Sequence, residues 1–430
     1  MERQWITVRE YAHLTTPVTP GMASTLDHVQ ISPSAFDWLC KLQAGLNDTG
    51  ARLIVLDNRR TLRLDSYVGT ISTPCGTDIE ILPKHFSSTD PIEKSRQLMC
   101  RLIASALNLP WREAGNADLN LFYYPLSEWV IRQFLAALGQ LIKRGLRFDY
   151  QQVDEDEQPF LRGQLDMSRQ LRQLPGSQHR FHQRQTLFLP NRPENRLLRL
   201  ALDKICLETQ KPQNWRLSHE FINLMQEVPP SRQVNPDFAR WGNDRLMMHY
   251  RAIRPWCQLV LGEQLPLAIQ GTARGISLLF PMDRLFEQHV ARVLKHQLLS
   301  GVTLHSQATS EHLCRYNDTK LFLLKPDLVL MHGEKKWVLD TKWKRLEQVN
   351  GDDYCRFSQS DIYQMLAYGM RYLQPQQDLL LIYPKSAGFS IPVGPYILPN
   401  ELRLHALPFD RDNDLLLGSE AVRMPLDRLA

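Results

Sequence analysis

Three charged residues interrupt two apolar segments in the last third of the sequence. Asp327 precedes the apolar run 328–330, and Asp340 and Lys342 end a second apolar run that starts at Trp337. Charged side chains inside apolar strands conflict with burial, and such conflicts often mark functional sites. Because side chains alternate along a strand, Asp340 and Lys342 lie on the same face. The pattern indicates a site that uses carboxylates and an ammonium group together.

The two apolar segments are spaced as the strands of one β-hairpin. Asp327 and Asp340 lie at equal distances from a turn centred between Gly333 and Glu334. A symmetric hairpin places the two carboxylates opposite each other, with Cβ atoms about 5 Å apart. Like charges so close are unfavourable unless a cation compensates them, and a β-bulge would shift this register. We therefore expect a divalent cation beside Asp327 and Asp340.

Metal-assisted hydrolysis of a phosphodiester is the chemistry that fits this arrangement. Mg²⁺ prefers oxygen ligands, keeps several waters and accepts phosphate oxygens. Lys342 could orient or deprotonate an attacking water, or stabilise the developing charge, and the Thr341 carbonyl could reach the metal. The simpler interpretation is an ordinary ion pair of Asp340 with Lys342 or Lys344. An Asp-x-Lys tripeptide alone favours that interpretation, whereas Asp327 at the matching distance favours a site.

Two expected helices flank the hairpin and add candidate residues. Glu287 borders the apolar face of a helix expected at Asp283–Leu299. It is a candidate metal or water ligand, although a surface salt bridge explains it equally well. In a helix expected at Ser360–Leu373, Gln364 and Tyr368 lie four residues apart and share one side. They could contact the site or a DNA backbone, but the pair alone is a weak signal.

The pattern of apolar residues predicts a multidomain α+β protein with three regions. Residues 1–91 are predicted to form a β-rich N-terminal domain, because short strand-like segments alternate with Gly and Pro. Residues 92–270 are predicted to be a mainly helical middle region, with an acidic loop at 154–159. Residues 271–430, with a strand at Leu321–Met331, follow the order strand, strand, helix, strand. This order is typical of an α/β core with a crossover.

Composition and motifs exclude several classes of protein. The net charge of +5 over 430 residues fits an anionic partner without identifying one. No apolar run approaches the ~18 residues that a membrane span needs. The sequence has no P-loop motif, and its seven cysteines include no Cys-x-x-Cys pair. We expect a soluble, cytoplasmic protein that does not interact with membranes and is not itself a P-loop NTPase.

The candidate residues together resemble the PD-(D/E)xK nuclease superfamily. Its pattern matches Pro326-Asp327 and Asp340-Thr341-Lys342, with Glu287 before them and the Gln364 to Tyr368 motif, which is similar to that of RecB-type nucleases, after them. Further segments resemble, in order, McrC-like nuclease subunits of McrBC-type modification-dependent restriction systems. These segments lie at 143–146, 162–166, 194–198, 285–287, 339–343, 361–365 and 381–384.

This resemblance implies a Mg²⁺-dependent endonuclease subunit that cuts modified DNA, with Mn²⁺ as a substitute ion. It also implies a partner, an McrB-like AAA+ GTPase ring, which the middle region would contact and whose NTP hydrolysis the chain would stimulate. The C-terminal region would be an α/β restriction-endonuclease-like domain. Its implied metal ligands are Asp327, Asp340, Thr341 and Glu287, and its catalytic set adds Lys342, Gln364 and Tyr368. Two alternatives stay open: a non-catalytic adaptor that activates an AAA+ motor, and a stand-alone RecB-type repair nuclease.

Overall fold

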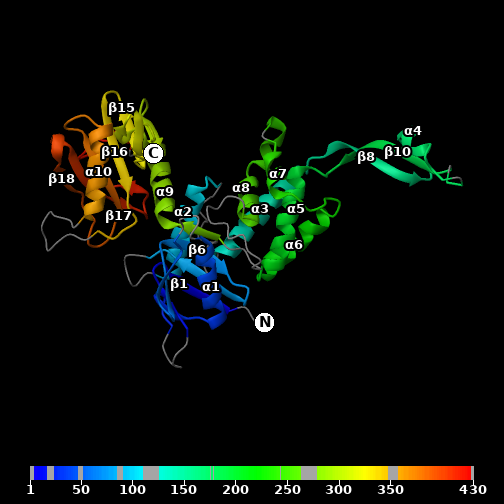
Figure 1. The fold of residues 1–430 in the computed structure, drawn as a ribbon, viewed down its shortest axis with the longest axis horizontal. Coiled ribbons are helices and arrows are strands. Elements are labelled where there is room, and N and C mark those ends of the chain that lie inside the picture. Colours follow the sequence, from blue (N-terminus) through cyan, green and yellow to red (C-terminus); the bar gives the residue numbers. More distant parts are fainter. Residues whose placement is uncertain are drawn as a thin grey trace. The chain divides into compact units, whose positions relative to one another are not determined.

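The protein is a mixed α+β chain with several sheets, and it divides into two compact units. The computed structural model describes residues 4–16, 24–46, 52–84, 91–109, 125–174, 176–177, 179–242, 244–262, 278–346 and 357–427. The first unit joins residues 1–123 with 279–430, and the second unit is residues 124–278 (Figure 1). Within the described ranges, no helix is both long and apolar enough to cross a membrane.

The N-terminal part of the first unit contains two four-stranded sheets, in agreement with its β-rich sequence. One sheet has the order β1-β7-β6-β11 and the other has the order β3-β2-β5-β4. The elements are β1 (Gln4–Arg9), β2 (His13–Thr15), β3 (His28–Gln30), α1 (Pro33–Leu46), β4 (Ile54–Asn58), β5 (Thr61–Leu64), β6 (Tyr67–Ser72), β7 (Thr77–Leu82), α2 (Ile92–Ala106) and β11 (Leu278–Pro281). Strand β11 begins more than 200 residues after β6 ends, so the outer edge of β6 is paired only by a segment that is distant in the sequence.

Helix α2 belongs to the first unit, whereas we expected residue 92 to begin the middle region. Its apolar face packs against β7 and against α9 (Met282–Gln297). Arg96 of α2 donates to both carboxylate oxygens of Glu80, a fully buried residue of β7, with a shortest distance of 2.6 Å. A buried carboxylate needs such a partner. Helix α2 therefore belongs with the sheet that contains Glu80, because Arg96 neutralises that carboxylate. The first segment of this unit extends to residue 123.

The C-terminal part of the first unit is built on a mixed seven-stranded sheet. Its order is β12-β15-β16-β17-β19-β18, and β20 pairs with β19. The strands are β12 (Thr303–Ser306), β15 (Leu328–His332), β16 (Lys335–Thr341), β17 (Asp378–Pro384), β18 (Val393–Ile397), β19 (Arg403–Asp410) and β20 (Leu415–Leu416). The hairpin β15–β16 is antiparallel, whereas β16, β17 and β19 are parallel neighbours. Helix α10 (Gln359–Tyr372) lies between β16 and β17 in the sequence, as the crossover pattern predicted.

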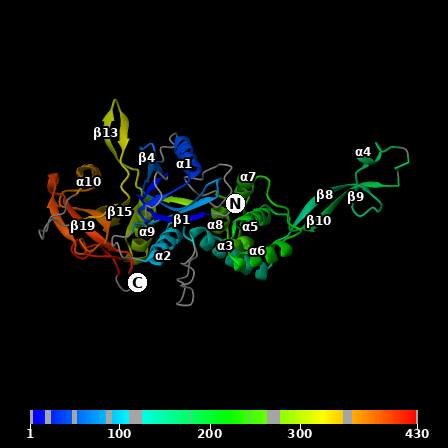
Figure 2. The same ribbon diagram turned by 90° about the horizontal axis from the view of Figure 1, so that it is seen from below.

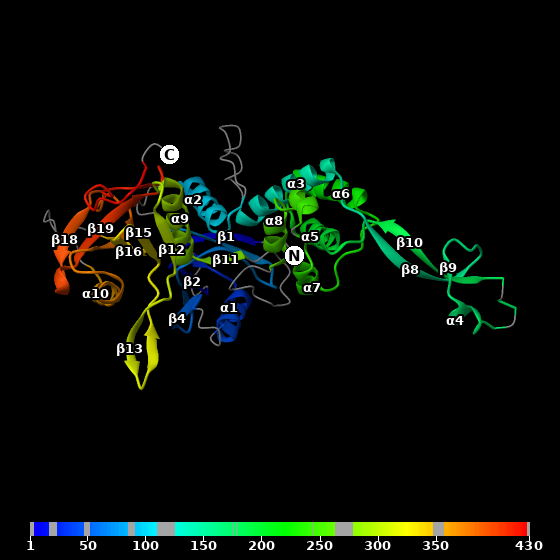
Figure 3. The same cartoon turned by 90° about the horizontal axis from the view of Figure 1, so that it is seen from above.

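The single strand that we expected at Leu321–Met331 is wrong, because the structure contains two strands there. Strand β14 (Thr319–Leu323) pairs with β13 (His312–Tyr316) in an exposed hairpin that projects from the sheet (Figure 3). Strand β15 begins only at Leu328. Pro326 lies in the break, and proline cannot donate a hydrogen bond to a strand neighbour. The break leaves Asp327 at the mouth of the β15–β16 hairpin.

The second unit consists of helices and a long two-stranded arm. Its helices are α3 (Leu126–Arg144), α5 (Pro193–Glu208), α6 (Pro212–Leu224), α7 (Val234–Ala239), η3 (Arg245–Tyr250) and α8 (Arg254–Leu261). Helix α3 ends before Gly145, whose φ of 93° is accessible mainly to glycine. Glu128 of α3 is buried and accepts hydrogen bonds from Thr209, Gln210 and Asn214, which join α5 to α6.

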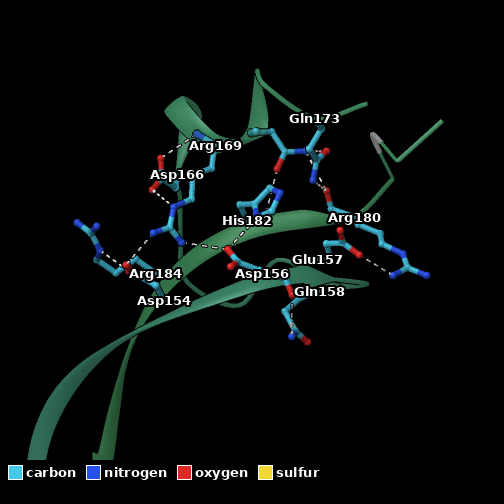
Figure 4. Close-up of polar contacts among 11 residues, drawn as sticks. Asp154, Asp156, Glu157, Gln158, Asp166, Arg169, Gln173, Arg180, His182 and Arg184 are labelled. Atoms are coloured by element: carbon cyan, nitrogen blue, oxygen red, sulfur yellow. Dashed lines mark hydrogen bonds and ion pairs between the residues drawn. The ribbon is translucent and has the colours of Figure 1, made fainter. Parts of the chain in front are cut away.

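The arm consists of β8 (Asp149–Gln158) and β10 (Phe181–Leu189), and it extends away from the helices of its unit (Figures 1 and 2). We expected an acidic loop at 154–159, and this expectation is wrong. The four acidic residues 154–157 follow one another on β8, and two of them pair with basic residues: Arg184 Nε lies 2.8 Å from Asp154, and His182 Nδ1 lies 2.8 Å from Asp156 (Figure 4). Opposite charges across a strand pair stabilise it, so the acidic stretch forms a strand. Beyond it lie β9 (Gln164–Leu165) and α4 (Met167–Gln170).

Candidate active site

The hairpin register predicted from the sequence is confirmed. Leu328 pairs with Leu339, and His332 pairs with Lys335, so the turn is centred between Gly333 and Glu334. Continuing this register by one residue brings Asp327 opposite Asp340. The break before β15 does not shift it, because the ladder is regular from its first pair. The structure therefore brings together the two carboxylates that the spacing singled out.

Asp327 is held in place by hydrogen bonds from Thr341. Its Oδ2 atom accepts from the Thr341 amide at 2.7 Å and from the Thr341 hydroxyl at 2.8 Å. From the sequence, the Thr341 carbonyl is a candidate metal ligand. In the structure, the Thr341 amide and hydroxyl orient the Asp327 carboxylate. The Asp327 backbone carbonyl accepts from the amide of Gln307 at 2.7 Å. These contacts fix Asp327 at the end of the sheet with Oδ1 still available.

Asp340 is almost completely buried, with 1% of its surface exposed. Burial and the nearby charge of Asp327 together raise its pKa from 3.8 to about 7, although Lys342 opposes the shift. Both effects act against the ionised form. A buried carboxylate beside a second, half-buried carboxylate that repels it is an electrostatically unfavourable arrangement that a cation would relieve.

Lys342 supplies a positive charge next to Asp340. Its Nζ lies 2.5 Å from Asp340 Oδ2 and donates to Gln364 Oε1 at 2.9 Å. Burial lowers the pKa of Lys342, but the Asp340 carboxylate outweighs that effect, so the pKa is raised above its ordinary value. The side chain is therefore an ammonium ion in this arrangement. In this state it can stabilise negative charge, and it cannot accept a proton.

A chain of hydrogen bonds links Lys342 to α10 and back to the strand break. Gln364 Nε2 donates to the Tyr368 hydroxyl at 2.7 Å, and that hydroxyl donates to the Lys325 carbonyl at 3.0 Å. Burial raises the pKa of Tyr368 to about 12, so the phenol keeps its proton. The sequence placed Gln364 and Tyr368 on one side of a helix, and the structure brings both to the site. Their contacts position Lys342.

Glu287 on α9 lies on the other side of Asp327. Burial raises its pKa, and the charge of Asp327 adds to the effect. Gln307 Nε2 donates to Glu287 Oε1 at 3.0 Å, while its own amide holds the Asp327 carbonyl. Sequence reasoning missed Gln307, because nothing in its surroundings in the sequence distinguishes it. Asp361, one turn before Gln364, pairs instead with Lys344 at 3.2 Å.

The donor set fits a divalent cation that takes few ligands from the protein. Asp340 Oδ2 is buried and accepts no hydrogen bond of normal geometry despite its ion pair with Lys342. In the part of the chain that the structure describes, no three His, Cys, Asp or Glu side chains lie close enough to form a complete metal site. Mg²⁺ binds through one or two carboxylates and completes its shell with water and phosphate. Asp327 and Asp340 offer two carboxylates of this kind.

Comparison with known proteins agrees with the resemblance seen in the sequence. The family model described as "McrBC 5-methylcytosine restriction system component" matches residues 62–384, most of the chain. The chain belongs to this family. No curated protein sequence matches the chain.

Two solved structures are similar to this chain. A chain of the refined half-complex from the tetradecameric assembly of Thermococcus gammatolerans McrB AAA+ hexamers with bound McrC has a TM-score of 0.68 and 20% identity, over 95% of each chain. A chain of the Thermococcus gammatolerans McrBC complex has a TM-score of 0.49 and 21% identity, over 68% of this chain and 87% of that one. At this identity, the first match establishes a shared fold.

Proposed function

We propose that this chain is the Mg²⁺-dependent endonuclease subunit of an McrBC-type restriction system and cuts modified DNA. The observation that carries the proposal is the pair of the half-buried Asp327 and the buried Asp340 at the end of the β15–β16 hairpin, with the Lys342 ammonium 2.5 Å from Asp340. Membership of the McrBC component family supplies the biological setting. The C-terminal sheet, with α9 and α10, is on this proposal the restriction-endonuclease-like core.

Each residue of the site has a distinct role in the proposed reaction. Asp327 and Asp340 would hold Mg²⁺, with Glu287 reaching it directly or through water. When bound, the ion supplies Lewis-acid activation of the scissile phosphate and of a water, and Mn²⁺ can take its place. Lys342 orients the water and stabilises the charge that develops on the phosphate. Gln364 and Tyr368 hold the ammonium in position.

The partner that we propose is an McrB-like AAA+ GTPase ring. The structurally similar assembly contains McrB AAA+ hexamers with bound McrC. The arm of the second unit offers a surface for such a contact, because large apolar side chains are exposed along it. Tyr150 is 72% exposed and Phe188 is 57% exposed, and their rings lie 4.9 Å apart. Exposed apolar patches rimmed by polar residues mark protein interaction sites. The ion pairs of Asp154 and Asp156 stiffen the arm.

The test is cleavage of methylated and unmethylated plasmid DNA with Mg²⁺, with and without the AAA+ partner and GTP. The chain and an Asp340→Ala variant are compared, with Asp412→Ala, an exposed carboxylate outside the site, as the matched control. We expect cleavage that needs partner and nucleotide, that disappears in Asp340→Ala and that persists in the control. Cleavage by the chain alone would favour a stand-alone nuclease. Faster GTP hydrolysis without any cleavage, in wild type and variant alike, would favour an adaptor.

A further inference from the structure

A pocket lies at the end of the C-terminal sheet where the parallel strands β16, β17 and β19 begin. Its volume is about 310 Å³. Trp337, Asp378 and Arg403 are direct neighbours in the register of these strands, so their side chains share one face of the sheet. His405, two residues after Arg403, lies on the same face. The first residues of the three parallel strands thus form one wall of the pocket.

This pocket is separate from the candidate active site. Trp337 and Asp340 are three residues apart on β16, so their side chains lie on opposite faces and about 10 Å apart along the strand. Asp340 is on the face that carries Val338 and Leu381, which belong to the core packed with α10. The pocket therefore opens on the opposite face and at the opposite end of the strands.

The pocket is lined by more positive charge than its carboxylate neutralises. Asp378 is the only acidic residue in its lining, and both its oxygens are engaged, by Arg403 at 2.9 Å and by His405 at 3.1 Å. Lys335, Lys336 and Arg423 also line it. Among the residues that the structure describes, none of these three side chains makes an ion pair or hydrogen bond. Lys336 shares the face of Val338 and Asp340, so among the described residues Lys335 and Arg423 are the cations that line this space without a counter-charge.

The walls that carry these cations are fixed by hydrogen bonds. Trp337 Nε1 donates to the Val422 carbonyl at 3.1 Å, which anchors the turn that carries Arg423. Gln377 Nε2 donates to the Glu334 carbonyl at 3.1 Å, which anchors the turn that precedes Lys335. One anchor comes from the buried Trp337 of β16 and the other from the half-buried Gln377, which directly precedes β17. The cations are thereby held around a formed cavity, which lowers the cost of binding an anion.

We propose that this pocket binds a phosphate group, either of a nucleotide or of a nucleic-acid backbone. Phosphate carries the multiple negative charges and the several acceptor oxygens that Lys335 and Arg423 can engage together. A pocket of this size also has room for the sugar attached to that phosphate. Binding there is distinct from the cleavage proposed at Asp340 and does not require it.

The experiment compares Lys335→Glu/Arg423→Glu with Lys41→Glu/Lys94→Glu, both in the full-length chain. The control changes the net charge equally at exposed lysines of α1 and α2. All measurements contain EDTA, so that a failure of the proposed nuclease activity does not affect them. One arm measures the fluorescence anisotropy of a labelled DNA duplex at several salt concentrations, and the other measures GDP binding by calorimetry. Thermal melting verifies that both variants are folded.

A backbone phosphate predicts that Lys335→Glu/Arg423→Glu loses about tenfold or more in DNA affinity relative to the control. The slope of log K against log salt should then fall by about two charges. A nucleotide phosphate predicts that wild type and control bind GDP and the pocket variant does not, with equal DNA affinities. Equal behaviour of both variants in both arms, or no binding of either probe by wild type, would overturn the proposal.

Discussion

Glu10 has a buried carboxyl group whose ionisation should make the first unit less stable as pH rises. It is fully buried, and its Oε1 atom accepts hydrogen bonds from the Lys84 amide at 2.7 Å and from Trp343 Nε1 at 2.8 Å. Ser66 reaches the other oxygen, Oε2, at 3.5 Å. Burial raises the pKa of Glu10 from 4.5 to about 7, although these hydrogen bonds oppose the shift. The carboxyl joins the N-terminal strands to the residue that follows Lys342.

The sign and size of the effect follow from this shift. Below pH 4.5, Glu10 is protonated in both the folded and the unfolded chain, and its contribution to stability is fully present. Between pH 4.5 and about 7 the unfolded chain ionises first, so stability is lost as pH rises, and the loss is complete above the folded pKa. At about 1.4 kcal/mol for each pKa unit, the cost of ionising Glu10 in the folded chain reaches about 3 kcal/mol.

Glu10→Gln should remove this cost without removing the contacts. A glutamine carbonyl at the position of Oε1 still accepts from Lys84 and Trp343, and its amide can donate to Ser66. We expect the variant to be more stable than wild type by about 3 kcal/mol at pH 8 and by less than about 1 kcal/mol at pH 5. In melting temperature, the gain at pH 8 corresponds to about 5 °C or more.

The assay is thermal melting of wild type and Glu10→Gln across this pH range, with Glu334→Gln as an exposed control. Other titrating groups contribute equally to both proteins, so the difference between them isolates residue 10. A gain that is the same at pH 5 and pH 8, or a loss at pH 8, would refute the reasoning. The control should shift by less than about 1 °C at either pH.

Three further predictions concern the site and the second unit. Asp340→Asn removes the charge that repels Asp327, so without metal the variant should melt at a higher temperature than wild type. Millimolar Mg²⁺ should raise the melting temperature of wild type only. An equal rise in both proteins would contradict the assigned ligands. Tyr368→Phe leaves the Lys325 carbonyl without its donor and should cost about 1 kcal/mol, with a smaller loss of single-turnover cleavage than Asp340→Ala. Glu128→Ala leaves buried donors of Thr209, Gln210 and Asn214 unpaired and should lower the free energy of unfolding by about 3 kcal/mol. Hydrogen exchange in α3 and α6 should become faster, whereas the surface control Glu227→Ala should have no effect. Unchanged exchange in Glu128→Ala would exclude a structural role for the Glu128 carboxylate.

Local patterns predicted the parts of the site that depend on local geometry. The mirror spacing of Asp327 and Asp340 about one turn was enough to give the β15–β16 register, because a hairpin connects its strands directly. The four-residue spacing of Gln364 and Tyr368 was likewise enough to put them on one side of α10.

Contacts between distant segments could not be predicted in this way. Gln307 joins Glu287 to Asp327, yet its own sequence neighbourhood carries no signal. The acidic stretch of β8 read as a loop because Arg184, the partner of Asp154, comes 30 residues later. Helix α2 read as the start of the helical region because the sheet that it covers is not visible in its own periodicity.

The discontinuous sequence of the first unit has a consequence for synthesis on a ribosome. Strand β6 is an inner strand only after β11 has been made, and the chain of the second unit, residues 124–278, is translated before β11 is complete. Until then one edge of β6 is unpaired in the nascent protein, and Glu10 lacks the hydrogen bond from Trp343. Open edges pair with other chains and promote aggregation. A chain truncated before residue 278 should therefore be prone to aggregation, whereas a gene fragment for 124–278 encodes a unit that is continuous in sequence.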